Sequence, residues 1–234
     1  MTLAVLAIGE LTVGGEPEIH APFVAAATAW LSTEPGLKVT HLQSPDPLTD
    51  RLLADYDLIL QLNYTPFRWN ATARAAFEKY LETGRGGWVG LHHAGLYGPV
   101  VTPESEPPWT WFHDFLGRIN YRDYIASCAS ATVHVEDGSH PLFEGVPAAF
   151  RVETDEWYVW DSSPRPHVHV LATVDEHSYD PASAIRMGDH PVIWTNPNHP
   201  GRNAYIFMGH HPDLFQNPAY VTLLRNAIRW AGAA

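Results

Sequence analysis

Residues 56–91, YDLILQLNYTPFRWNATARAAFEKYLETGRGGWVGL, contain the strand–helix–strand unit from which the fold can be predicted. Tyr56–Leu62 and Gly87–Leu91 are short apolar runs, as in parallel strands that are covered on both faces. Thr72–Thr83 between them has helical composition, and Gly84 ends the helix. Two strands joined by a helix predict a parallel pair.

The same alternation extends toward the N-terminus. Thr2–Ile8 and Leu37–Leu42 have strand patterns, whereas Ala21–Ser32 and Pro47–Ala54 favour helices. Four strand–helix alternations within the first ninety residues predict an α/β fold with a doubly wound, mostly parallel sheet and helices on both faces.

The second half adds a hairpin and a closing helix. Strands are predicted at Ala131–Val135 and Val168–Val174. Pro191–Thr195 and Asn203–Met208 are joined by a turn-rich linker, which favours a hairpin, and Pro218–Ala231 has the pattern of an amphipathic helix. We expect residues 1–234 to form a single domain.

Composition excludes several classes of protein. The chain has 234 residues, a formal net charge of -12 and 45% hydrophobic residues, which favours a globular protein and disfavours nucleic-acid binding. It has one cysteine, no P-loop, no GxGxxG motif and no apolar segment long enough for a bilayer. We therefore expect a cytoplasmic protein with no nucleotide cofactor and no membrane partner.

Histidines follow several of the predicted strands. The chain has 14 of them. Ligands of open α/β sheets bind at the carboxyl ends of the strands, where the sequence places His20, His92, His93, His210 and His211. A further polar segment, Asp155-Glu156-Trp157-Tyr158, lies in the sequence between the predicted strands at 131–135 and 168–174.

The segment Gly90–Gly95, with the sequence GLHHAG, has the pattern of a sharp strand-to-helix turn. Such a turn exposes one side chain at the top of the sheet, and small neighbours relieve the crowding. Here that side chain is His92, which suits proton transfer or metal binding better than acyl transfer. The sole cysteine, Cys128, lies in a segment without this pattern, so amidotransferase activity is not expected.

Three ordered segments resemble the ThuA-like (trehalose utilisation) family: GGWVGLHHA at 86–94, HPLFEGVPAAFRVETDEWY at 140–158, and PVIWT at 191–195 followed by GRNAYIFMGHHPDLFQNPAYVTLLRNAIRWA at 201–231. Residues before about 84 fit the family by pattern only. The resemblance implies a flavodoxin-like fold similar to class I glutamine amidotransferases, without a cysteine at the sharp turn. It also implies a link to disaccharide or keto-sugar metabolism.

The resemblance also implies site residues. The family's recurrent polar positions match His92, Asp155, Glu156, Tyr158 and His210. His20 matches an early histidine of the family, although the preceding GGEPEI differs from the usual glycine-rich loop.

Two kinds of site can be built from these residues. Imidazoles and a carboxylate could hold zinc, manganese, iron or nickel through His20, His92, Glu156 and His210. The same residues could instead form a metal-free acid/base cluster. Further candidates for contacting substrate or orienting the site are His93, Tyr158, Asp155, His211 and His113, together with Trp109, Trp111, Trp157 and Trp160, whose rings could stack on a sugar.

The leading hypothesis is an enzyme that acts on a small keto-glycoside or disaccharide. His92 or Glu156 would abstract a proton beside a carbonyl, and His210 or a metal would stabilise the oxyanion. Hydrolysis by a metal-bound water is a weaker alternative, and a non-catalytic sugar-binding or regulatory domain is another. Aromatic residues in the proline-rich stretch Pro99–Pro108 could support a homodimer.

Overall fold

The computed structural model describes residues 2–125 and 128–233, and its centre is a nine-stranded sheet with the order β4-β1-β5-β6-β13-β12-β11-β8-β9. The first five strands pair in parallel. They are β4 (Leu37–Leu42), β1 (Leu3–Ile8), β5 (Leu58–Leu62), β6 (Gly87–Leu91) and β13 (Asn203–Ile206). This is the flavodoxin-like doubly wound order, so the predicted α/β fold is confirmed.

The other half of the sheet is antiparallel. It consists of β12 (Pro191–Thr195), β11 (His169–Asp180), β8 (Ala129–Val135) and β9 (Ala149–Asp155). β12 and β13 pair in antiparallel register, as the predicted C-terminal hairpin requires. Two small sheets complete the strands. One pairs β7 (Tyr121–Tyr124) with β10 (Tyr158–Trp160), and the other pairs β2 (Thr12–Val13) with β3 (Glu16–Pro17).

The helices are α1 (Ala21–Thr33), α2 (Asp50–Leu53), α3 (Ala71–Glu82), α4 (Thr110–Leu116) and α5 (Pro218–Gly232). Four of the helices lie close to predicted positions, whereas α4 was not predicted from the sequence. The side chains of Asn70 and Asn217 accept hydrogen bonds from backbone N–H groups in the first turns of α3 and α5. Short 3₁₀ turns are η1 (Pro66–Arg68), η2 (His92–Gly95), η3 (Pro141–Phe143) and η4 (Pro212–Gln216).

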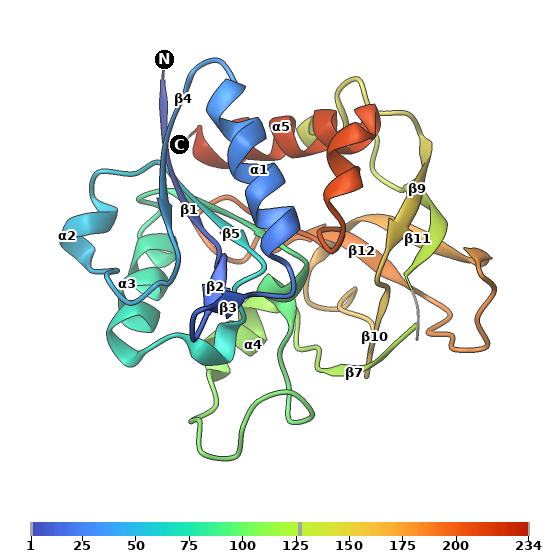
Figure 1. The fold of residues 1–234 in the computed structure, drawn as a ribbon, viewed down its shortest axis with the longest axis horizontal. Helices are drawn as coiled ribbons and strands as arrows, with labels where there is room; N and C mark the ends of the chain where they lie inside the picture. Colours follow the sequence, from blue (N-terminus) through green and yellow to red (C-terminus); the bar gives the residue numbers. More distant parts are fainter. Residues whose placement is uncertain (1, 126–127, 234) are drawn as a thin grey trace.

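The helices form two layers around the parallel strands. Figure 1 shows α1 and α5 together above the sheet, and α3 and α4 on the opposite side. In the parallel half, α1 and α3 each connect the carboxyl end of one strand to the start of a later strand across a face of the sheet. The strand ends stay together at one edge, where the site lies.

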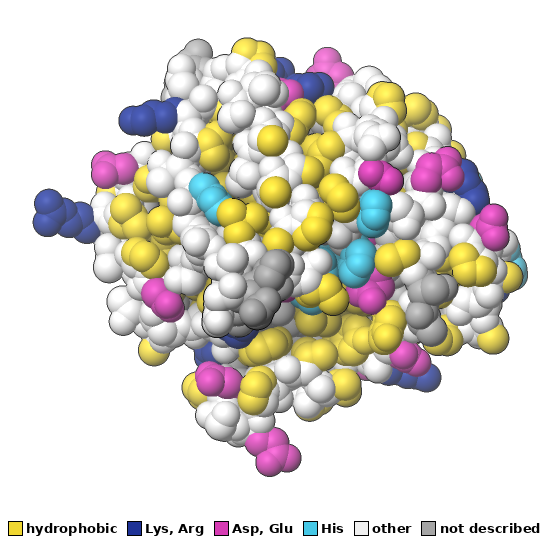
Figure 2. All heavy atoms as spheres, in the orientation of Figure 1, with side chains coloured by type: hydrophobic (Ala, Val, Ile, Leu, Met, Phe, Trp, Pro, Cys, Tyr) yellow, Lys and Arg dark blue, Asp and Glu magenta, His cyan; other side chains and the backbone are white. Residues whose placement is uncertain are grey.

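The surface differs between its margin and its middle. In Figure 2 acidic and basic side chains lie mostly around the margin of the visible face, whereas histidine and hydrophobic side chains gather nearer its middle. Within residues 2–125 and 128–233, no helix is long and apolar enough to span a membrane.

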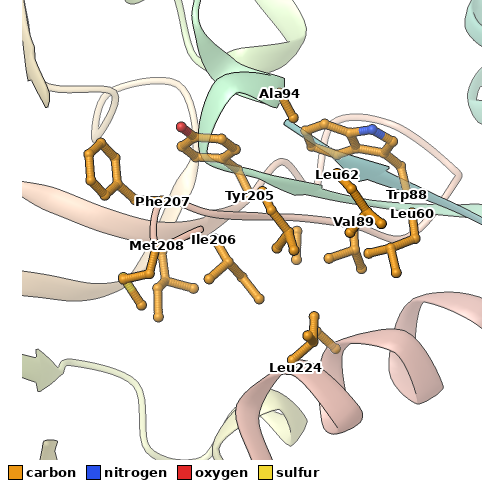
Figure 3. Close-up of a cluster of buried hydrophobic side chains, with 14 of the residues drawn as sticks. Leu60, Leu62, Trp88, Val89, Ala94, Tyr205, Ile206, Phe207, Met208 and Leu224 are labelled. Atoms are coloured by element: carbon orange, nitrogen blue, oxygen red, sulfur yellow. The ribbon is translucent and has the colours of Figure 1, made fainter. Parts of the chain in front are cut away.

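The buried core lies on both faces of the parallel strands. Figure 3 shows Val89 and Ile206 pointing toward Leu224 of α5, while Trp88 and Tyr205 point to the other face. On that face the ring of Trp88 contacts the ring of Phe115, with 5.1 Å between their centroids. Burial on both faces holds β6 and β13 firmly, and these two strands position the residues that follow them.

Candidate metal centre

Four side chains that are distant in sequence meet at the carboxyl edge of the sheet. His20 is the N-cap of α1, in the connection that follows β1. His92 follows β6 directly, and His210 follows β13. Glu156 follows β9, at the far end of the antiparallel half. We call His20, His92, His93, His210 and Glu156 the histidine cluster.

His92 stands at the sharp turn predicted from the sequence. Its φ of 49° lies in the left-handed region, which costs a residue other than glycine about 1–2 kcal/mol. Gly209 allows the close approach that this turn needs, because a Cβ atom there would lie 2.9 Å from the Cβ of His92. The strained backbone directs the imidazole of His92 to the centre of the cluster.

The ring nitrogens of three histidines converge on one point. Nε2 of His20 lies 3.3 Å from Nδ1 of His210, which lies 3.4 Å from Nε2 of His92. One nitrogen from each of the three lies within 4.8 Å of the others. Oε2 of Glu156 is 3.7 Å from both the His92 and the His210 nitrogen.

In His92 and His20, the hydrogen bond at Nδ1 determines that the lone pair is on Nε2, the nitrogen that faces the centre of the cluster. Nδ1 of His92 lies 3.2 Å from the carbonyl oxygen of Phe207, which can only accept, so Nδ1–H donates. Nδ1 of His20 faces a carboxylate oxygen of Glu18 at 3.4 Å and is placed to donate in the same way. Both Nε2 atoms then point inward unprotonated, as in metal sites in which a carboxylate or carbonyl orients the ligand.

These distances fit a first-row metal ion. Nitrogens that bind a tetrahedral ion at about 2.0–2.1 Å are roughly 3.3–3.4 Å apart. The two measured nitrogen separations are 3.3 and 3.4 Å. Three imidazoles with an adjacent carboxylate are a donor set suited to zinc, manganese, iron or nickel.

Burial favours the neutral forms of His92, His93 and His210. Burial, aided by the neighbouring His20 and His210, holds the pKa of His92 well below its usual value. Burial and the surrounding imidazoles do the same to the pKa of His93. Burial also lowers the pKa of His210, an effect that the carboxylate of Glu156 opposes. Neutral imidazoles are the form that binds metal.

Asp155 lies beneath the cluster and has no exposed surface. Its carboxylate accepts hydrogen bonds from the backbone N–H groups of Gly209, His210 and Glu156 at 3.0, 3.1 and 2.8 Å. Burial raises its pKa to about 8 in spite of these bonds. Asp155 is thus placed to tie the end of β9 to the end of β13, rather than to face a substrate.

Tyr158 closes one side of the cluster. Its hydroxyl lies 2.9 Å from Nε2 of His92, and the two rings stack with centroids 4.7 Å apart. The ring of Tyr121 packs edge-on against Tyr158 at 5.1 Å. Burial raises the pKa of Tyr158 well above its usual value, so its hydroxyl stays protonated and can donate a hydrogen bond.

His93, which belongs to the cluster, and His211, which does not, have different surroundings. The ring of His93 stacks on that of His92 at 5.0 Å, and His93, His92 and Glu156 form a second group of neighbouring donor atoms. His211 points away and accepts a hydrogen bond from the backbone N–H of Asp213 at the start of η4.

The structure places the remaining predicted residues in different surroundings. Trp157 is fully buried, with its indole donating to the carbonyl of Ala129 and its ring stacked on Phe207. Trp109 packs against Trp69 and donates to Glu78. The others pack as follows: Trp111 against Phe115, Trp160 against Trp194, and His113 beside Tyr97.

Two residues of the site were missed in the sequence. Glu18 orients His20, and Asn63 joins three strand ends. The side chain of Asn63 donates to the carbonyl of Gly209 at 2.7 Å and accepts from the N–H of His93 at 3.1 Å. Asn63 has a φ of 60°, a conformation that asparagine tolerates better than most residues. The position of Asn63 directly after an apolar strand is the sequence signal that could have identified it as a site residue.

The strand order and the sharp turn after β6 define a protein with a class I glutamine amidotransferase-like fold, in which a histidine stands at the turn. Cys128 is exposed and lies just before β8, so it does not stand at this turn. The sequence profile of the ThuA family, described as trehalose utilisation, matches residues 11–231. The chain therefore belongs to the ThuA family, which links it to carbohydrate metabolism.

Solved structures agree with this assignment. A protein from Bacteroides uniformis described as ThuA-like is 30% identical, with a TM-score of 0.83 over 98% of this chain and 91% of its own. A second, from Parabacteroides merdae, is 16% identical with a TM-score of 0.66 over 100% and 91% of the two chains. A β-galactosidase from Bacillus circulans shares the fold in 31% of its length, at 13% identity, a TM-score of 0.59 and 97% coverage of this chain. No curated protein matches the chain.

Proposed function

We propose that this protein is a metal-dependent enzyme that acts on a small carbohydrate carrying a carbonyl group, such as a keto-glycoside or keto-disaccharide. The observation that carries the proposal is the convergence of ring nitrogens from His20, His92 and His210, with separations of 3.3 and 3.4 Å. Nε2 of His20 and Nε2 of His92 both face Nδ1 of His210, and a shared cation would stabilise this arrangement of nitrogens.

The residues around the three histidines have separate tasks. When bound, a divalent metal would polarise the carbonyl oxygen of the substrate. Glu156, whose side chain is 20% exposed, takes the proton from the carbon next to that carbonyl. His92 has no exposed surface and its Nε2 points to the metal position, so Glu156 is the better base. The hydroxyl of Tyr158 donates a hydrogen bond in the same space.

The low pKa values of the buried histidines also support an enzyme over a plain sugar-binding domain. A binding domain can use exposed histidines with ordinary titration, whereas proton transfer or metal binding uses desolvated groups. The pKa values of His92 and His93 both lie well below the usual value for histidine.

The test is elemental analysis of purified, tag-free protein by inductively coupled plasma mass spectrometry. We expect near-stoichiometric zinc, manganese, iron or nickel, and its loss in the His92→Ala/His210→Ala double variant. His177→Ala is the matched control, because His177 is exposed and outside the cluster. Absence of metal from a correctly folded wild-type protein would refute the proposed centre.

Turnover gives a second readout. Glu156→Gln should keep the metal and lose turnover of a keto-disaccharide, because the amide cannot accept the proton. Unchanged turnover in both Glu156→Gln and His92→Ala would contradict the mechanism.

A further inference from the structure

Three tyrosine rings extend outward from the histidine cluster. Tyr158 is stacked on His92, and the ring of Tyr121 packs edge-on against Tyr158 at 5.1 Å. Exposure rises from Tyr158 at 2%, through the partly buried Tyr121, to Tyr124 at 39%. We call these three rings the tyrosine wall. The function proposed above uses only the hydroxyl of Tyr158.

The pairing of β7 with β10 places the three rings on one face. Tyr124 lies directly opposite Tyr158 in antiparallel register, and the side chains of directly opposite residues share a face. The register shifts next to Trp160, so that Trp160 pairs with Tyr121 and not with Arg122. A β-bulge of this kind re-aims side chains, and here it brings Tyr121 to the face of Tyr124 and Tyr158.

An exposed aliphatic side chain borders the cluster from another side. Ile19 directly precedes His20 and is 74% exposed. The rings of His20 and Tyr158 both contact His92, with centroids 5.3 and 4.7 Å from its own. Figure 1 shows β2 and β3, the strands before Ile19, on one side of the strand ends, and β7 and β10 on the other. Ile19 and the tyrosine wall therefore border the cluster from two sides.

This apolar border lies beside donor groups that solvent can reach. The side chains of Glu156 and His210 are each 20% exposed. Figure 2 shows hydrophobic side chains next to histidines near the middle of the visible face. Apolar side chains that are exposed around a few convergent polar groups are typical of surfaces that bind a ligand.

The chemistry of the border favours an apolar group over a second sugar ring. The hydroxyl groups of a sugar lose water when they bind and need polar partners in return. The side chain of Ile19 has no hydrogen-bonding group, and the rings of Tyr121 and Tyr124 have apolar faces. A planar aryl group can stack on a tyrosine ring and cover Ile19 without such partners.

We propose that Ile19 and the tyrosine wall bind the aglycone of the substrate, and that this aglycone is aromatic. The inference rests on the proposed function for the keto-sugar ring and narrows the substrate to aryl glycosides. Tyr124 and Ile19 determine which group is accepted beyond the glycosidic bond, whereas the histidine cluster acts on the sugar ring.

The experiment is isothermal titration of the full chain with three probes: phenyl glucoside and methyl glucoside, each as both anomers, and trehalose. We expect phenyl glucoside to bind about tenfold more tightly than methyl glucoside, and more tightly than trehalose. Tyr124→Ala and Ile19→Ser should each lower the ratio of phenyl to methyl affinity about three- to fivefold, the effect of one lost apolar contact. Tyr124→Phe should keep the ratio, because the ring and not the hydroxyl makes the contact.

Val100→Ser is the matched control. Val100 is 66% exposed and lies in the proline-rich loop that Figure 1 shows below α4. This variant loses an exposed aliphatic side chain, as Ile19→Ser does, and should keep the wild-type ratio.

Four results would overturn the inference. They are no binding of phenyl glucoside, equal binding of the phenyl and methyl probes, tighter binding of trehalose, and a ratio that Tyr124→Ala and Ile19→Ser leave unchanged. Sedimentation velocity tests a second copy of the chain as the occupant. A wild-type dimer that dissociates in Tyr124→Ala would assign the border to that copy and refute the aglycone site.

Metal analysis of the same samples separates this inference from the proposed function. A metal-loaded protein without preference for the phenyl probe refutes the aglycone site alone. A metal-free, folded protein that keeps the preference, and loses it in Tyr124→Ala, refutes the metal centre alone.

Discussion

Two groups of buried histidines in this protein have opposite hydrogen-bonding states. Nδ1 of His190 lies 3.0 Å from the carboxylate of Glu176, and its Nε2 lies 2.8 Å from the carbonyl oxygen of Tyr158. Both nitrogens therefore have protein acceptors. In the histidine cluster, His20 and His92 each use one nitrogen in this way and direct the other toward a neighbouring imidazole.

The difference separates a structural histidine from one that can bind a ligand. Burial does not distinguish the two kinds of histidine, because His92 is 0% exposed and His190 is 1% exposed. A histidine whose two nitrogens both face protein acceptors has no lone pair to offer. Nε2 of His92 faces the hydroxyl of Tyr158, which can donate, and the imidazole of His210, so it keeps a lone pair that can bind a metal. His190 instead supports the backbone of Tyr158, whose hydroxyl contacts His92.

Breaking the structural pair should have the largest effect on stability. We expect His190→Ala to lower the free energy of unfolding by about 3–5 kcal/mol, because the buried carboxylate of Glu176 loses its side-chain partner. Urea denaturation measures this change. The exposed control His177→Ala should stay within about 0.5 kcal/mol of wild type. Loss of metal from folded His190→Ala, with little change in stability, would contradict the distinction between the two groups.

Acid should weaken the same pair. Burial raises the pKa of Glu176, but hydrogen bonds from His190 and two backbone N–H groups outweigh it and lower the pKa to about 2. The folded-state pKa is below the unfolded value, so the stabilisation is present above about pH 4.5 and is lost as pH falls toward 2. At pH 6 the free energy of unfolding of the wild type should exceed that of Glu176→Gln by up to roughly 3 kcal/mol. This difference should become smaller at pH 2.5. A constant gap would show that the charge of Glu176 contributes nothing.

Much of the parallel half was predictable from the sequence. Apolar runs fixed β1, β5 and β6 to within two residues at each end, because strands buried on both faces need continuous apolar sequence. GLHHAG predicted the sharp turn at His92, which has the positive φ. The long β11 was predicted only in part, as Val168–Val174, because irregular register against its neighbours interrupts its pattern.

The site was predictable only as a set of strand ends. Strand order brings His20, His92 and His210 together, but side-chain contacts with distant backbone atoms leave no local pattern. Asn63 bonds to Gly209, 146 residues away. Proximity in sequence was also a poor guide for Trp157, which follows Glu156 yet packs into the core.

The link between β9 and β13 offers a way to loosen the metal centre without removing a donor. Asp155→Asn replaces one acceptor oxygen with an N–H₂ group. Either the N–H of Gly209, which bonds to Oδ2, or the N–H groups of His210 and Glu156, which share Oδ1, then lose their acceptor. We expect metal affinity to fall about 10–100-fold, as for other residues that orient ligands. Competition with a chelator measures the affinity, and circular dichroism checks the fold. Wild-type affinity in a folded variant would show that Asp155 does not position the donors.

Glu18 should give the smallest change, because it orients a single ligand. Its carboxylate faces Nδ1 of His20 at 3.4 Å and accepts from the backbone N–H of the same residue. Glu18→Ala should weaken metal binding about tenfold, at the lower end of the range for such partners. Glu18→Gln should recover most of the loss, because the amide oxygen still accepts from Nδ1–H and keeps Nε2 free. If Gln and Ala weaken binding equally, the charge of Glu18 matters more than its hydrogen bond, and the comparison with His190 must then be based on charge rather than on free lone pairs.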